Sequence, residues 1–332
     1  MKKVSMQDIA DRLGVSKGTV SLVLSGKAKG NRISDETSMK VKQAAKEMNY
    51  YPNEIARSLS TGITMSIGVI VTDISNEFFG SLTFHIQERA KKYGYTVITM
   101  NTNESLEEFY DAVSILLNKQ IDGIIFVPVA GGECVVEKII ERNLPIVQID
   151  RFYPELKASY IVVDNYKASM QATELLIHKG HKKIAAINYD INLNTLLERR
   201  QGYIDMMKRY GLFDPSLIKD INYEDQEEQI RQAIIDLKDN PDKVEAIFFC
   251  SRRVFITGIK HMRREGIRIP EDMEVLSFDK IETISIANIP ISFIEQPIAR
   301  MGEGTVDMLM EQIHGDRQIK QSVLNTEIKH SI

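Results

Sequence analysis

Apolar residues in the first 24 positions recur at helical spacing in two short runs. The first run places Ile9 and Leu13 four positions apart, and the second repeats the spacing with Val20, Val23 and Leu24. Residues three or four apart lie on one face of a helix. The pattern therefore predicts two short amphipathic helices in succession.

Polar residues beside these runs predict where each helix begins and ends. Ser5 and Asp8 have the spacing of a capping box, and Ser16 is a good N-cap for the second helix. Gly14 suits the left-handed conformation that ends a helix. So tight a turn favours a helix-turn-helix, although two short amphipathic helices also occur in any helical bundle. In a helix-turn-helix, the residues facing the DNA major groove would be Lys17, Gly18, Ser21 and Leu22.

A third helix is expected to complete this head. Residues 25–33 form a loop rich in glycine and lysine, and Ser34 can cap the helix that follows. Asn49 would end that helix, because proline at position 52 disfavours helical structure before it. Its expected apolar face consists of Met39, Val41, Ala44, Ala45 and Met48.

Residues 53–62 predict a hinge. Asn53 can cap a short helix, and Gly62 can end it. A helix of this length is not stable alone in water. Its apolar residues, Ile55, Ala56 and Leu59, have no evident core to join. We expect a segment that orders on binding, the alternative being an ordinary linker.

Beyond residue 65 the pattern changes to short continuous apolar runs that alternate with amphipathic helices. Near-continuous apolar strands between helices predict parallel sheets with both faces covered. The order repeats and is too long for one small domain, so we expect two similar α/β lobes. A ligand cleft would lie between them, beyond the carboxyl ends of the strands. The expected strands are 66–72, 96–100, 122–129, 145–150, 160–164, 183–188, 245–249, 273–278, 291–294 and one near 322–328.

The chain has 332 residues, enough for two or three domains. Its two cysteines, Cys134 and Cys250, lie far apart, which excludes a disulfide framework and fits a reducing cytosol. No N-terminal stretch resembles a signal peptide, and no apolar run approaches the length of a membrane span. We therefore expect a cytoplasmic protein without a membrane partner.

Charge is distributed unevenly along the chain. Residues 1–62 carry 11 Lys and Arg against 6 Asp and Glu, whereas the remaining residues carry 31 against 40. Phosphate binding needs such a local positive excess, whatever the overall sign. An excess of this size could also be a solvated surface, but together with the helix-turn-helix pattern it favours DNA binding.

The sequence contains none of the common catalytic or phosphate-binding motifs, neither a P-loop nor a G-x-S-x-G elbow nor H-E-x-x-H. Its six histidines do not cluster. We therefore expect no enzyme activity, no cofactor and no metal site.

Polar and aromatic residues follow the expected strands, at the edge where a ligand would bind. They are Asp73, 76–79, Asp150, Arg151, 251–253, Asp279 and 295–297. Any one of them could be an ordinary strand-end cap. Several that converge on one edge favour a binding cleft, and carboxylates and arginines with aromatic rings suit a polyhydroxylated ligand.

The chain resembles the LacI/GalR family of bacterial transcriptional regulators over essentially its whole length. The resemblance is carried by MQDIA (6–10), LGVSKGTVS (13–21), YPNEIARSL (51–59), IGVIV (67–71), DISNEFF (73–79), VDN (163–165), GHKKI (180–184), IPED (269–272), SFD (277–279) and QP (296–297). It implies an all-α helix-turn-helix head plus an α/β two-lobed, periplasmic-binding-protein-like core with parallel sheets. The implied domains are a DNA-binding head at 1–52, a hinge helix and linker at 53–62, and an effector-binding and dimerisation core at 63–332.

The resemblance further implies a homodimer that binds double-stranded operator DNA and represses a carbohydrate-utilisation operon. Its small-molecule effector would be a sugar, sugar acid or sugar phosphate. By position, the implied DNA contacts are Ser5, Met6, Ser16, Lys17, Gly18, Thr19, Ser21, Leu22, Asn53, Ala56 and Leu59, with Leu59 as a wedge in the minor groove. The implied effector contacts are Asp73, Phe78, Phe79, Asp150, Arg151, Arg199, Ser251, Arg252, Asp279 and Gln296.

Three departures from the family pattern qualify these expectations. Leu22 stands where the family often has arginine, the usual reader of guanine, so the operator should differ there. The loop 27–33 is longer than usual. Ser251 and Arg252 replace a frequent Asn-Asp pair, and Arg252 could bind an anionic effector, or point to solvent or bridge to a helix.

Two other classes of protein share part of the predicted organisation. A sugar-binding protein of the transport type would share the two-lobed core, but it would need a signal peptide and would lack a basic head. An enzyme carrying this head would need a catalytic constellation that the sequence does not offer. We expect the effector to act by changing the spacing of the two hinge segments in the dimer.

Overall fold

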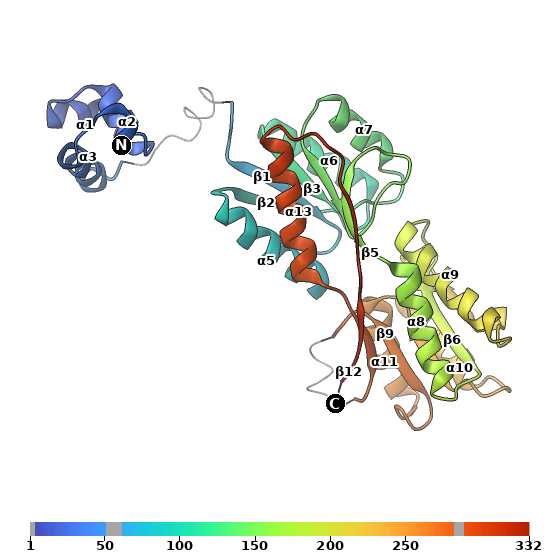
Figure 1. The fold of residues 1–332 in the computed structure, drawn as a ribbon. Coiled ribbons are helices and arrows are strands. Elements are labelled where there is room, and N and C mark those ends of the chain that lie inside the picture. Colours follow the sequence, from blue (N-terminus) through green and yellow to red (C-terminus); the bar gives the residue numbers. More distant parts are fainter. Residues whose placement is uncertain (1–3, 51–61, 282–288, 332) are drawn as a thin grey trace. The chain divides into compact units, whose positions relative to one another are not determined.

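The computed structural model describes residues 4–50, 62–281 and 289–331 (Figure 1). The chain divides into two compact units, Met1–Thr64 and Met65–Ile332. The expected hinge helix, with Asn53, Ala56 and Leu59, lies outside the described residues.

The first unit contains the helix-turn-helix that the apolar spacing predicted. Its elements are α1 (Met6–Leu13), α2 (Lys17–Leu24), the 3₁₀ helix η1 (Lys29–Asn31) and α3 (Asp35–Glu47). Ile9, Val20 and Val23 are fully buried in its small core, together with Val41 from α3. The expected place of Met39 in this core was wrong, because its side chain is 67% exposed. Met39 lies two positions before Val41, on the far side of a helix that turns 3.6 residues at a time.

The caps of α1 and α2 form as the sequence predicted. The Asp8 backbone N–H donates to Ser5 Oγ at 3.3 Å, and the Ser5 N–H donates to the Asp8 carboxylate at 2.7 Å. Gly14 has φ +66°, the left-handed conformation that ends α1. Ser16 Oγ accepts the Thr19 N–H at 3.0 Å and so begins α2. These local bonds fix the start of α1 and α2 and the end of α1.

The second unit contains the two expected α/β lobes. The first lobe, here the N-lobe, has a six-stranded parallel sheet in the order β11-β5-β4-β3-β1-β2. Its strands are β1 (Ser66–Val71), β2 (Thr96–Asn101), β3 (Gly123–Phe126), β4 (Ile146–Ile149), β5 (Ser159–Val163) and β11 (Gln321–Leu324). Its helices are α5 (Glu77–Lys92), α6 (Leu106–Asn118), α7 (Glu133–Glu141) and α13 (Ile298–Ile313). The pair α5 and α13 covers one face, and α6 with α7 covers the other (Figure 1).

The second lobe, here the C-lobe, has a six-stranded sheet in the order β12-β10-β9-β8-β6-β7. Its strands are β6 (Ile184–Tyr189), β7 (Ile218–Ile221), β8 (Ala246–Phe249), β9 (Glu274–Phe278), β10 (Ser292–Glu295) and β12 (Glu327–His330). The helices α8 (Asn165–His178) and α9 (Asn194–Arg209) pack on one face. The other face is covered by α10 (Gln226–Lys238) and α11 (Arg252–Arg264), and the short 3₁₀ helix η2 (Pro215–Leu217) precedes β7.

Two details of the sheets differ from expectation. The sequence pattern missed β7, a short edge strand of the C-lobe. The single strand expected near 322–328 is instead two strands, β11 in the N-lobe sheet and β12 in the C-lobe sheet. Because β12 pairs antiparallel with β10, the C-lobe sheet is mixed and not wholly parallel. Pairing partners of this kind are remote in sequence, so local pattern does not reveal them.

The described chain crosses between the lobes three times. It passes after β5 at Asp164, after β10 at Pro297, and between β11 and β12 at 325–326. The carboxyl ends of β1, β4, β8 and β9 therefore face a common junction between the lobes. This is the position at which open parallel sheets bind ligands.

Candidate functional site in the helix-turn-helix and the interlobe cleft

Helix α2 presents a polar face to solvent. Val20 and Val23 anchor its other face in the core, whereas Lys17, Gly18 and Ser21 are exposed. A Cβ at Gly18 would meet only Ser16 Oγ, at 3.6 Å. The head therefore does not need glycine at position 18, and the missing side chain leaves the backbone open to close approach by a partner.

The other expected DNA contacts of the head have local structural tasks as well. Ser16 and Thr19 bond to one another through their hydroxyl groups at 2.9 Å. Ser5 is exposed beside its cap, and Leu22 is half-buried. Met6 is also half-buried and packs against the core of the head.

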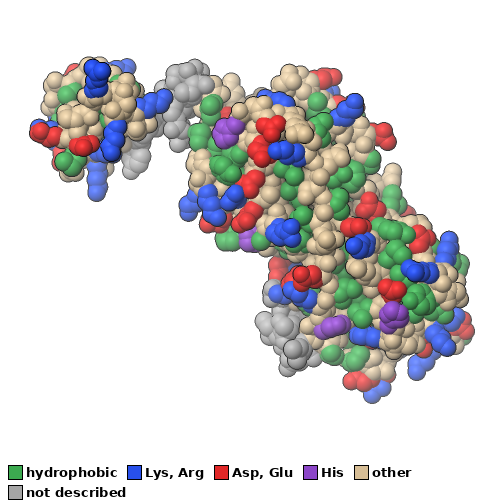
Figure 2. Space-filling view, in the orientation of Figure 1, with side chains coloured by type: hydrophobic (Ala, Val, Ile, Leu, Met, Phe, Trp, Pro, Cys, Tyr) green, Lys and Arg blue, Asp and Glu red, His purple; other side chains and the backbone are tan. Residues whose placement is uncertain are grey.

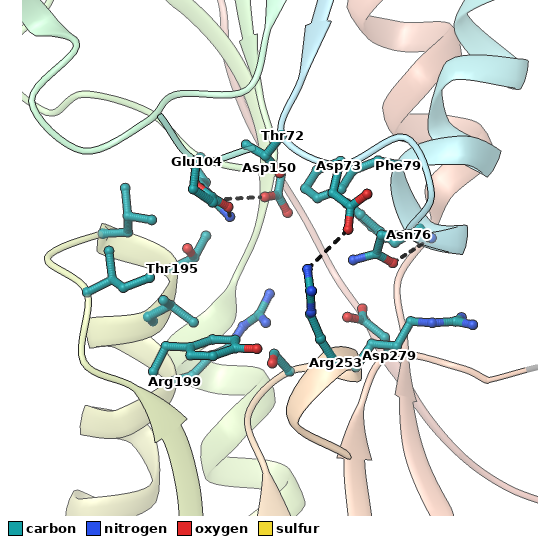
Figure 3. A pocket seen from close by; sticks show the side chains of 18 of the residues that line it. Thr72, Asp73, Asn76, Phe79, Glu104, Asp150, Thr195, Arg199, Arg253 and Asp279 are labelled. Atoms are coloured by element: carbon teal, nitrogen blue, oxygen red, sulfur yellow. Dashed lines mark hydrogen bonds and ion pairs between the residues drawn. The ribbon is translucent and has the colours of Figure 1, made fainter. Parts of the chain in front are cut away.

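All ten expected effector residues line one cleft between the lobes (Figure 3). The cavity in this cleft has a volume of about 80 Å³. The N-lobe contributes residues that follow β1, β2 and β4, and the C-lobe contributes residues that follow β6, β8, β9 and β10. Asn76 and Arg253, which the sequence placed at the ligand-binding edge outside the ten contacts, also line it. So do residues that the sequence pattern did not single out: Thr72, Glu104, Tyr189, Ile191, Leu193, Thr195, Leu196 and Tyr223.

Two buried carboxylates, one from each lobe, are held on strained backbone. Asp150 follows β4 with φ +69°, and Asp279 follows β9 with φ +90°. Left-handed backbone is uncommon for residues other than glycine, and such strain clusters at functional sites. Burial raises the pKa of both carboxyl groups, against the opposing pull of Arg151 and Arg199 on Asp150 and of Arg199 on Asp279.

Arg199 supplies the buried positive charge beside these carboxylates. Its Nε donates to Asn165 Oδ1 and its Nη1 to the Cys250 carbonyl, both at 2.9 Å. The guanidinium carbon lies 3.5 Å from the centre of the Phe278 ring, a cation–π contact. Burial lowers the pKa of Arg199, and the nearby carboxylates Asp279 and Asp150 oppose that shift.

Buried polar atoms at the base of the cleft have no partner within the described residues. Gln296 Nε2 donates to Asp279 Oδ1 at 2.6 Å, which leaves Gln296 Oε1 unsatisfied. Thr72 Oγ1 is also unsatisfied. Buried polar groups are nearly always hydrogen-bonded, so such atoms in a cleft are suited to a polar ligand.

Arg151 is already bound within the N-lobe. Its Nη1 and Nη2 both donate to the Glu104 carboxylate at 2.8 Å, and Nη1 also reaches the Pro128 carbonyl at 3.2 Å. A bidentate pair of this kind orients both side chains. Arg151 thus positions Glu104 at the cleft wall.

Two ion pairs bridge the lobes across the cleft. Arg252, the first residue of α11, pairs with Glu77, the first residue of α5, and also donates to the Lys280 carbonyl at 3.3 Å. Arg253 Nη1 lies 3.4 Å from Asp73 Oδ2 (Figure 3). Of the roles considered for Arg252, the structure shows the bridge to a helix.

Sequence pattern could have found some of the overlooked cleft residues. Glu104 and Tyr189 stand at strand ends, as the predicted contacts do. Tyr223 follows β7, the strand that the pattern missed. The ion pair between Arg253 and Asp73 joins distant parts of the chain and carries no local signal.

A helix-turn-helix head followed by a two-lobed, ligand-binding α/β core defines a DNA-binding regulator of the effector-responsive class. The chain belongs to the LacI family. Residues 5–53 match the model for bacterial regulatory proteins of the lacI family, and residues 64–331 match that for periplasmic binding proteins and the sugar-binding domain of the LacI family. The protein is therefore a LacI-type DNA-binding transcriptional regulator.

Two relatives similar to this chain over most of its length are transcriptional repressors. The HTH-type transcriptional repressor CytR of Escherichia coli (strain K12) is 30% identical over 318 residues, which cover 94% of this chain and 90% of that protein. The ribose operon repressor of Haemophilus influenzae is 29% identical, with 93% of this chain and 92% of that protein covered.

Solved structures show the same fold. The Lac repressor dimer bound to operator and the anti-inducer ONPF has a TM-score of 0.86, with 22% identity and 99% of both chains covered. A putative ribose operon repressor from Burkholderia thailandensis has a TM-score of 0.73 at 26% identity, with 80% of this chain and 98% of that chain covered. Among the described residues, no helix is long and apolar enough to cross a bilayer.

Proposed function

We propose that this protein is a cytoplasmic, homodimeric repressor of a carbohydrate-utilisation operon, with no catalytic role. The supporting observation is the cleft in which two strained carboxylates, Asp150 and Asp279, flank Arg199. Buried charged donors and acceptors of this kind bind the hydroxyl groups of a sugar-like effector. The ten residues predicted from the sequence are the proposed effector contacts.

The proposed DNA contacts come from the head and the hinge. The exposed face of α2 would enter the major groove, with Lys17 and Gly18 at the bases and Ser16, Thr19 and Ser21 at phosphates. Ser5, Met6 and Leu22 are further proposed DNA contacts of the head. Leu59 would enter the minor groove. The proposed domains are the DNA-binding head at 1–52, the hinge helix and linker at 53–62, and the effector-binding and dimerisation core at 63–332.

The effector would act on the arrangement of the lobes. The cavity of about 80 Å³ is smaller than the ~150 Å³ known to hold one benzene molecule. A second hollow of about 400 Å³ shares Arg252, Asp279 and Gln296 with this cavity. We expect a sugar-sized ligand to extend into that hollow or to part the lobes, and parting would break the Arg252–Glu77 and Arg253–Asp73 pairs. Whether the effector releases DNA or promotes its binding depends on which lobe arrangement binds operator better.

The test is a thermal-shift screen of sugars, sugar acids and sugar phosphates on the full chain, with each hit repeated in an operator-binding assay. A hit is expected to raise the melting temperature and change operator affinity in the wild type. Both effects should be lost in Asp279→Asn and kept in Asp220→Asn, a surface carboxylate paired with Arg200. Hits that bind equally to Asp279→Asn, or that leave operator affinity unchanged, would refute the proposal.

A further inference from the structure

A further hollow crosses the junction of the two lobes on the surface, outside the effector cleft. We call it the junction hollow; its walls include Phe152, Tyr160, Asp164, Tyr166, Leu197 and Glu198. None of its lining residues also lines the cleft. Its volume of about 610 Å³ lies within the range of about 300–1,000 Å³ that is usual for small-molecule sites.

Both lobes contribute to the junction hollow. The N-lobe lines it with β5, the edge strand β11 and the loop that follows β4. The C-lobe lines it with one side of α9 and the first turn of α8. The hollow therefore lies where the chain first crosses from one lobe to the other, at Asp164.

The surface of the junction hollow is largely aromatic and aliphatic. Phe152 and Tyr160 stack with their ring centres 4.3 Å apart and their planes 18° apart. Tyr166 is 36% exposed, Leu197 50% and Val323 56%. Hydrophobic side chains are exposed on the surface where the lobes meet (Figure 2). Apolar side chains gathered in one hollow, as these are, mark a binding surface more strongly than scattered ones do.

The charge beside this apolar surface is negative. Asp164 caps α8 by accepting the Lys167 N–H at 2.9 Å, and Glu198 is half-buried on α9. Within the described residues, neither carboxylate forms an ion pair. Burial raises the pKa of Glu198 and the charge of Asp164 raises it further, against Arg199 and a hydrogen bond with Asn165. The two acids therefore lie close enough to repel one another, and a cation between them would relieve that repulsion.

The hollow's own arginine does not supply that cation. Arg200 is held by Asp220, to which its Nε and Nη2 donate at 3.1 and 3.0 Å. The described residues also contain no group of three or more possible metal ligands, so a bare metal ion is a poor match for the two acids. Aromatic ring faces attract organic cations and also pack against an apolar body.

We propose that the junction hollow binds a small organic cation, a protonated amine carried on a planar apolar body. The ammonium group lies at Asp164 and Glu198, and the body packs on the stacked rings of Phe152 and Tyr160. An anionic ligand would meet the repulsion of both carboxylates, and a neutral one would leave their charge unbalanced. The inference goes beyond the function proposed above and does not depend on it, because the hollow is separate from the effector cleft.

Calorimetric titration of the full chain with three matched probes tests the proposal. Phenethylamine, phenethyl alcohol and phenylpropionate share a ring and a two-carbon spacer, but they are cationic, neutral and anionic at neutral pH. Phenethylamine is expected to bind about tenfold or more tighter than phenethyl alcohol, and phenylpropionate should bind most weakly. Spermidine, a cation without a ring, should bind more weakly than phenethylamine.

Four results would overturn the proposal. They are an alcohol that binds as tightly as the amine, tightest binding by the acid, tighter binding by spermidine than by phenethylamine, and no binding of phenethylamine at millimolar concentration.

Variants of the hollow place the amine. Glu198→Gln keeps the size of a half-exposed side chain and should remove most of the amine's advantage, while the alcohol binds as before. Leu197→Arg, on a half-exposed residue of the rim, should weaken the amine by repulsion. The matched control is Glu174→Gln, because Glu174 also lies on α8 but accepts from the Tyr210 hydroxyl, outside the hollow. An advantage that survives both hollow variants, or one that the control also abolishes, would refute this site.

Discussion

Arg199→Met removes the positive charge between two buried carboxylates and keeps a side chain of similar length. In the wild type, Arg199 is 5% exposed and opposes the burial that raises the pKa of Asp150 and Asp279. Methionine can pack on the Phe278 ring, but it cannot donate to the Cys250 carbonyl or to Asn165. The variant therefore leaves two buried acids without this partner.

The magnitude follows from the burial of the site. Arg199 is a charged donor to Asn165 Oδ1 and to the Cys250 carbonyl, and each hydrogen bond from a charged group of this kind contributes about 1.5–3 kcal/mol to the free energy of unfolding. Each further unit of pKa increase on Asp150 or Asp279 corresponds to about 1.4 kcal/mol between the charged and neutral forms. Protonation of either carboxyl group relieves part of this loss, so the effect depends on pH.

The direction of the pH dependence follows from the raised pKa values of Asp150 and Asp279 in the folded protein. A carboxyl group whose pKa is raised in the folded protein binds its proton more tightly there than in the unfolded chain. The free energy of unfolding therefore falls as pH rises from the ordinary aspartate pKa of 3.8 through the raised pKa. Arg199→Met raises both pKa values further and extends that fall to higher pH. The difference from wild type should therefore be larger at about pH 8 than at about pH 5.

Urea unfolding at several pH values measures this difference, with Arg200→Met as the matched control. Arg200 is the next residue of α9, but it pairs with Asp220 at the surface, and both side chains are about a third exposed. Its loss should change stability by less than about 1 kcal/mol at every pH. The reasoning would be refuted if Arg199→Met lost no more free energy of unfolding than the control. It would also be refuted if the loss were the same at the two pH values. Either result would show that Arg199 does not balance the charge of these carboxylates.

Three further predictions concern the head, the hinge and the C-lobe core. Gly18→Ala should stabilise the head by up to about 1 kcal/mol, because alanine has the higher helix propensity. The same variant should weaken operator binding, because the added methyl group stands on the exposed face of α2. Tighter operator binding in a fluorescence anisotropy titration would contradict a close approach of the DNA to the backbone at this position. Leu59→Ala should weaken operator binding and leave effector affinity intact, and a variant that binds operator normally would remove the hinge from the mechanism. In Gly202→Val the new Cβ would lie 2.4 Å from the Tyr166 carbonyl oxygen, between α8 and α9. Urea unfolding should therefore show a free energy of unfolding lower by about 1–3 kcal/mol. An unchanged unfolding midpoint would count against that close contact.

Many of the residues that line the cleft could be predicted, because the ends of the strands can be recognised in the sequence. Asp73, Asp150 and Asp279 each follow a continuous apolar run, and parallel sheets place such positions at one edge. Helix caps were equally legible, since Ser5 and Ser16 bond to backbone groups only three residues away. Hydrogen bonds of this kind form within one turn and need no tertiary contact.

The sequence by itself thus determined the helix-turn-helix, the two α/β lobes and the edge at which the cleft lies, because spacing and capping are properties of neighbouring residues. Only the tertiary structure decided what the cleft side chains do. Arg252 was a free candidate for an anionic ligand until the fold brought Glu77 to it from the other lobe. In the same way, Tyr223 joined the cleft through a strand too short to recognise by its pattern. Partners of this kind are chosen by chain crossovers and sheet order, so residues remote in sequence set the charge balance and the apolar side of the site.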